Sequence, residues 1–88
     1  MDLDALLHHY FGPGGIERAD PATIETGIER LRTDFAVERD TGRRFALWAL
    51  LHALGRAPEP DAAFDDPEVA RTARDYAWAA SNAADKLE

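Results

Sequence analysis

Histidines are the side chains in this sequence best suited to bind a metal ion or to transfer a proton. His8 and His9 are adjacent, so on a helix they diverge by about 100° and cannot hold one ion together. Asp4 lies four residues before His8, but a protein metal site needs three or four ligands. We therefore interpret Asp4 and His8 as an exposed i,i+4 pair, and we expect no bound metal or cofactor.

Nucleophilic and acid–base catalysis have few candidate residues. Ser81 is the only serine, and it has neither a Gly-x-Ser-x-Gly setting nor a histidine nearby in the sequence. Carboxylates such as Asp65 and Asp66 fall at expected helix starts, where their usual role is to stabilise the helix N-terminus. The glycine-rich segment 12–15 lacks the Gly-Lys-Ser/Thr ending of a phosphate-binding loop, so we interpret it as a turn. We expect a protein that is not an enzyme.

Aromatic side chains gather in one segment. Phe45, Trp48 and His52 fall at i, i+3 and i+7, on one face of a helix. They are candidates for a pocket that binds a small apolar or aromatic ligand, with His52 as the lone polar group that orients it. The alternative is that His52 is a neutral core side chain with one hydrogen bond.

Trp78 has the most unusual position in the sequence, because it falls on the polar side of its predicted helix. Arg71 and Arg74 share that side, and tryptophan and arginine are enriched at the centres of protein interfaces. Arg74 lies one turn before Trp78, a spacing that allows a cation–π contact. Two interpretations remain open: these three residues bind a partner, or Trp78 folds back over the first helix or the 55–65 connector.

Length and charge limit the class of protein. The 88 residues predict a single helical domain over 1–88, which buries only about 60% of its unfolded surface and has no cysteine to cross-link it. A net charge of −7 disfavours nucleic acid and membrane surfaces as partners. An acidic N-terminal start and the lack of a long apolar run predict a cytoplasmic protein. Nine arginines against one lysine are typical of GC-rich bacterial genomes.

Capping and turn residues divide the chain into four predicted helices. Asp-Pro pairs mark two helix starts, and Gly12 and Gly55 mark two ends. The connector 57–60 contains two prolines and is expected to be extended. The predicted helices cover residues 2–11, 21–35, 41–54 and 67–87. Whether the second and third form one kinked rod is left open.

The third predicted helix is apolar on all sides. A ridge of leucines, Leu47, Leu50, Leu51 and Leu54, lies opposite its aromatic ridge. A helix of this kind is buried all round, so we expect a small, irregular, all-α four-helix bundle with this helix at its centre. The second helix should bury one narrow seam, and the fourth a face of mostly small side chains. The seam is Ile24, Ile28, Leu31 and Phe35, and the face is Val69, Ala73, Tyr76, Ala77, Ala80, Ala84 and Leu87.

The function that these patterns favour is a protein–protein interaction or regulatory module. A thin core and an alanine-faced helix would be stabilised by a second copy, so a homodimer is expected, with an unknown protein as the other possible partner. A helix-turn-helix DNA reader is disfavoured because the connector 55–65 is too long and the chain is acidic. Arg43 and Arg44 are interpreted as a small solvated basic spot.

Overall fold

The computed structural model describes residues 3–86, with side chains over 4–80, and is all-α as predicted. The described part is 78% helix and contains no strand. Four helices have nine or more residues and two are single turns. They are α1 (Leu3–Phe11), α2 (Gly15–Arg18), α3 (Pro21–Val37), α4 (Thr41–Ala53), α5 (Pro60–Ala63) and α6 (Pro67–Lys86).

Aspartates fix the starts of the three longest helices, because their carboxylates accept hydrogen bonds from backbone amides that a helix leaves unpaired. The aspartate–amide pairs are Asp20 with Thr23 at 2.8 Å, Asp40 with Arg43 at 2.9 Å and Asp66 with Glu68 at 2.9 Å. These starts are where the sequence predicted them. The cap at Asp40 follows a break at residues 38–40, so α3 and α4 are two helices and not one kinked rod.

The two single-turn helices were not predicted. At the first turn of the chain, Gly12 has a φ of 84° and its carbonyl accepts from the amide of Gly15 at 3.0 Å, so segment 12–15 is a turn as expected. The helix α2 begins at Gly15, the last residue of this segment. The connector 57–60 was expected to be extended throughout, and this is wrong for Pro60, which is the first residue of α5. A proline fits there because the first residue of a helix has no intrahelical partner for its amide.

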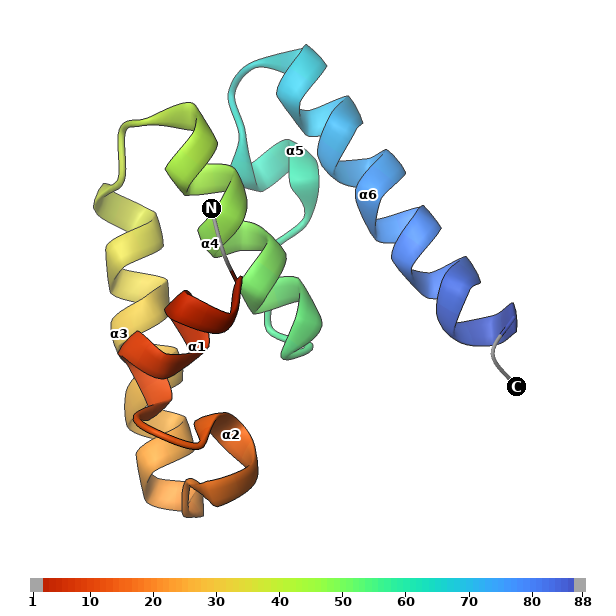
Figure 1. The fold of residues 1–88 in the computed structure, drawn as a ribbon. Coiled ribbons are helices and arrows are strands. Elements are labelled where there is room, and N and C mark those ends of the chain that lie inside the picture. Colours follow the sequence, from red (N-terminus) through yellow and green to blue (C-terminus); the bar gives the residue numbers. More distant parts are fainter. Residues whose placement is uncertain (1–2, 87–88) are drawn as a thin grey trace.

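The helix α4 lies in the middle of the fold, with α3 and α1 on one side and α5 and α6 on the other (Figure 1). Its residues 47–51 are all buried, which agrees with the prediction that this helix is apolar on all sides. The predicted seam of α3 is also confirmed, since Ile28, Leu31 and Phe35 are buried in the same core and Ile24 packs against it. Local periodicity thus identified the core faces of both helices.

Arg44 joins three segments of the core. Its Nε and Nη2 donate to the carbonyl of Ala63 at 3.1 and 2.7 Å, and Nη1 donates to the carbonyl of Phe35 at 2.5 Å. The guanidinium also lies 4.1 Å from the centre of the Phe35 ring. The interpretation of Arg44 as a solvated charge is therefore wrong: it ties the end of α3 and the end of α5 to the start of α4.

Only the first half of α6 packs as predicted. Of the predicted face, Ala73 is buried, Val69 and Ala77 are half-buried, and Tyr76 is 37% exposed; Ala70, which was not predicted, is also buried. Ala80, which was predicted to face inward, is exposed, and the side chains of Ala84 and Leu87 lie outside the described residues. In Figure 1, α6 begins at the top of the fold beside α5 and runs down and outward, so that its later part lies away from α4.

Candidate functional site

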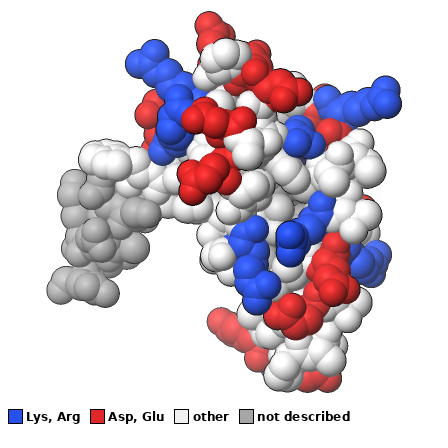
Figure 2. Space-filling view, turned by 180° about the vertical axis from the view of Figure 1, so that it is seen from behind, with Lys and Arg blue, Asp and Glu red and all other residues white. Residues whose placement is uncertain are grey.

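Trp78 lies on the surface, in the part of α6 that diverges from the core. Its side chain is 72% exposed, so it covers neither α1 nor the connector, and the interpretation of Trp78 as a core residue is wrong. Figure 2 shows white, uncharged side chains where this part of the molecule leaves the body; we call the part of α6 after Ala77 the arm. The other large apolar side chains exposed in the described part are Val37 at 71% and Tyr76 at 37%.

The two arginines predicted to accompany Trp78 differ in their environment. Arg74 forms an ion pair with Asp61 across the α5–α6 junction, at 2.5 Å between Nη1 and Oδ1. The cation–π contact expected between Arg74 and Trp78 is not formed. Arg71 is exposed and has no ion pair with any described side chain. We call Arg71, Arg74 and Trp78 the Trp78 surface; within it, the uncommitted cation is Arg71.

The aromatic side chains of α4 pack against one another and against two rings from elsewhere. Phe64 and Tyr76 lie 6.0 and 6.2 Å from Trp48, centre to centre. His52 stacks on Trp48 at 5.4 Å with 13° between the ring planes, and Phe45 contacts Phe64 at 5.8 Å. The predicted ligand pocket around Phe45, Trp48 and His52 therefore has ring faces that side chains of the same chain occupy.

The Trp48 indole also has its polar atom satisfied within the fold. Its Nε1 donates to the carbonyl of Pro58 at 2.9 Å, and the side chain is 1% exposed. This bond holds the connector after α4 against the core. Phe64, buried at the end of α5, holds the other end of the same connector, a role that its apolar side chain between Ala63 and Asp65 indicated.

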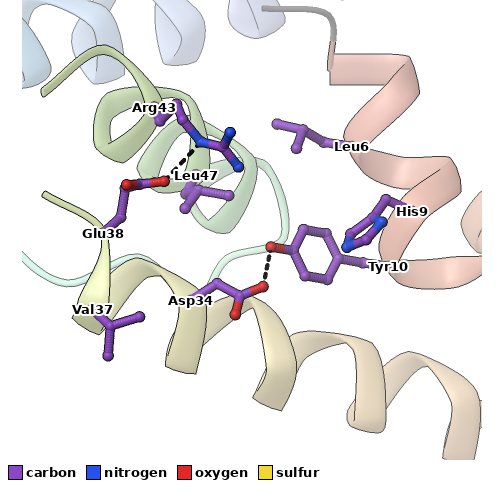
Figure 3. A pocket seen from close by; sticks show the side chains of 8 residues that line it. All are labelled: Leu6, His9, Tyr10, Asp34, Val37, Glu38, Arg43 and Leu47. Carbon is purple, nitrogen blue, oxygen red and sulfur yellow. Dashed lines mark hydrogen bonds and ion pairs between the residues drawn. The ribbon is translucent and has the colours of Figure 1, made fainter. Parts of the chain in front are cut away.

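A groove that the sequence did not predict lies between α1 and the corner where α3 meets α4 (Figure 3). It is open to solvent and has a volume of about 360 Å³. Three apolar and five polar side chains line it: Leu6, Val37 and Leu47, and His9, Tyr10, Asp34, Glu38 and Arg43. It lies at a junction of three helices, so no single segment carries its signature.

Two polar pairs shape the groove (Figure 3). The Tyr10 hydroxyl donates to Oδ2 of Asp34 at 2.5 Å, and Nε of Arg43 pairs with Oε1 of Glu38 at 2.7 Å. Burial of Tyr10, together with the hydrogen bond to Asp34 and its negative charge, raises the pKa of the phenol above its usual value. Tyr10 is thus held protonated at neutral pH, as a hydrogen-bond donor and not as a base or nucleophile.

The two carboxylates in the groove differ in how many of their oxygens are used. The second oxygen of Glu38 accepts from the backbone amides of Arg39 and Asp40, at 3.1 and 3.4 Å. Asp34 uses Oδ2 for Tyr10, while its Oδ1 has no hydrogen-bond partner among the described residues. Asp34 is therefore the acceptor in this groove that remains open to a ligand.

Comparison of the chain with protein-family models, with curated proteins and with solved structures finds no match. Among residues 3–86, no group of three histidine or carboxylate side chains is arranged to hold a metal ion. Within the same range, no helix is both long and apolar enough to span a bilayer. The features that bear on function are therefore the Trp78 surface and the groove.

Proposed function

We propose that this chain is a protein–protein interaction module that catalyses no reaction and associates with a second copy of itself through the Trp78 surface. The observation that carries the proposal is the 72% exposure of Trp78 on a helix half that diverges from the core. A tryptophan buries roughly 150–250 Å² when it is covered, which at about 25 cal/mol per Å² corresponds to several kcal/mol. A partner that covers Trp78 recovers much of that free energy.

The length of the arm supports the same conclusion. The helix α6 continues from Ala77 to Lys86, and the side chains described after Ala77, those of residues 78–80, are all exposed. A helical segment of fewer than about 12 residues is marginal in water without tertiary contacts. A partner helix or groove would supply the contacts that this part of α6 lacks within its own chain.

The alternative function, binding of a small apolar ligand beside Phe45, Trp48 and His52, has no observation in its favour. Phe64 and Tyr76 occupy space that such a ligand would need. Opening this cluster would also separate Trp48 from Pro58. We therefore do not propose it.

Sedimentation velocity over a range of about 1 to 200 µM tests the proposal. We expect a reversible dimer, and we expect Trp78→Ala to raise its dissociation constant about 30-fold or more, the usual loss at an interface hot spot. Thr72→Ala is the control, because Thr72 is exposed on α6 but on a different side from Trp78. A monomer throughout this range, or a Trp78→Ala dimer as tight as the wild type, would contradict the proposal.

A further inference from the structure

The groove and the Trp78 surface have complementary shape and charge. We propose that the groove beside Tyr10 receives Trp78 from a second copy of the chain, and that Arg71 of that copy binds Asp34. This inference rests on the proposed function and adds to it the receiving surface. In this dimer the arm of one copy contacts the groove of the other, and the two arms do not contact each other.

The apolar part of the groove fits an aromatic side chain. Leu6 and Leu47 are apolar side chains of its lining from α1 and α4, and Val37 contributes another that is 71% exposed. The volume of about 360 Å³ lies within the range of pockets that hold small organic molecules, and an indole ring is smaller than most of these. Docking of Trp78 would cover two of the large apolar side chains that the isolated chain exposes, Trp78 itself and Val37.

The polar groups of the two surfaces also match. Arg71 is exposed without an ion pair in the described part of the chain, and Asp34 has one oxygen without a partner. Arg71 precedes Trp78 by seven residues, so both side chains project from the same side of α6, two turns apart. A hydrogen bond between guanidinium and carboxylate is among the stronger ones that an interface contains. This match favours a second copy as the occupant.

Because every chain carries both surfaces, two copies can exchange arms, and the proposal is of such a closed dimer and not of an open chain of copies. In a two-fold dimer each copy offers its arm to the groove of the other, so the contact is made twice. This arm-to-groove dimer differs from an arm-to-arm dimer in how variants behave when they are mixed. A chain with a defective arm and a chain with a defective groove still form one intact contact when they are mixed.

The experiment combines Trp78→Ala, which removes the arm residue, with Val37→Asp, which places a charge in the groove at an exposed position. We expect each variant alone to dissociate with a constant more than about 30-fold above that of the wild type, because a dimer of either variant loses the contact at both of its places. An equimolar mixture should associate more tightly than either variant alone. Thr26→Asp adds the same charge at an exposed position nearer the start of α3, and we expect it to dimerise like the wild type.

Arg71→Glu and Asp34→Asn test the polar part of the contact, and Asp34→Asn keeps an acceptor for Tyr10. We expect each variant to raise the dissociation constant of the dimer about 10-fold. Circular dichroism is the control that tests whether each variant is folded. If Val37→Asp dimerises normally while Trp78→Ala does not, the groove is not the receiving surface, although the proposed function stands. If the mixture of Trp78→Ala and Val37→Asp associates no more tightly than either variant alone, this inference is wrong. The dimer is then arm-to-arm, or the groove binds another protein. If the wild type is a monomer or Trp78→Ala has no effect, both proposals fall.

Discussion

Gly27 lies in the middle of α3, and replacing it by alanine tests the packing of α1 on α3. From helix propensity alone, glycine to alanine inside a helix stabilises the folded state by about 1 kcal/mol. The structure predicts instead that Gly27→Ala destabilises the folded state. A Cβ at position 27 would lie 2.5 Å from Cε1 of Phe11 and 2.7 Å from the carbonyl oxygen of Tyr10.

The size of this destabilisation depends on whether the atoms next to the new Cβ can shift. The Phe11 ring is buried, so it has little room to withdraw, and the Tyr10 carbonyl belongs to the backbone at the end of α1. Forcing an extra carbon into a filled core typically costs about 1–3 kcal/mol, and occasionally more. Because neither neighbour can withdraw easily, we take the upper part of this range, about 2–3 kcal/mol. After the gain in propensity of about 1 kcal/mol is subtracted, we expect Gly27→Ala to lower the free energy of unfolding by about 1–2 kcal/mol.

Urea unfolding followed by circular dichroism measures this difference, at a low protein concentration where association does not contribute. Gly42→Ala is the matched control, because Gly42 is also helical and a Cβ there would meet only Oδ2 of Asp40, at 3.4 Å. We expect Gly42→Ala to be neutral or stabilising. If Gly27→Ala is as stable as Gly42→Ala, α1 does not approach α3 as closely as the structure has it.

Three further predictions concern the core, the groove and the arm. Arg44→Lys should lower the free energy of unfolding by about 2–3 kcal/mol, because an ammonium cannot hold the carbonyls of Phe35 and Ala63 together; urea unfolding unchanged by this variant would contradict the role of Arg44. Because the folded state raises the pKa of Tyr10, the phenol stabilises the fold below its ordinary pKa of 10.0 and loses that effect as pH rises above it. The stability difference between the wild type and Tyr10→Phe should thus be constant up to about pH 9 and narrow as the pH rises above 10 in urea unfolding, and a difference that stays constant above pH 10 would argue against this account. Acrylamide should quench the tryptophan fluorescence of dilute wild type strongly and that of Trp78→Phe weakly, since only buried Trp48 then emits; equal quenching would show that Trp48 is also accessible.

Helix starts could be predicted from the sequence because the interactions that create them are local. Asp20, Asp40 and Asp66 each bond to an amide two or three residues away, so the sequence around them contains both partners. The single turns α2 and α5 were missed, since they are too short to show a periodic pattern.

The core faces were predictable for a similar reason. Ile28, Leu31 and Phe35 recur at helical spacing, and the apolar segment of α4 leaves no polar side to face water. Periodicity identified which side of a helix is buried, but it gave no information about how far along the helix a neighbour extends. The expectation that α6 packs along its whole length therefore failed at Ala80.

Sequence alone was enough to predict the four long helices, the caps of three of them, and the buried sides of α3 and α4. The tertiary structure alone decided that Arg44 is a core tie, that Gly27 allows a close helix contact, that Trp78 is exposed, and that a groove forms beside Asp34. Each of these depends on segments that are distant in sequence, and their relative position follows from how whole faces pack together. A side chain's type and spacing do not specify that position, and so the surfaces from which the function is inferred appear only in the folded chain.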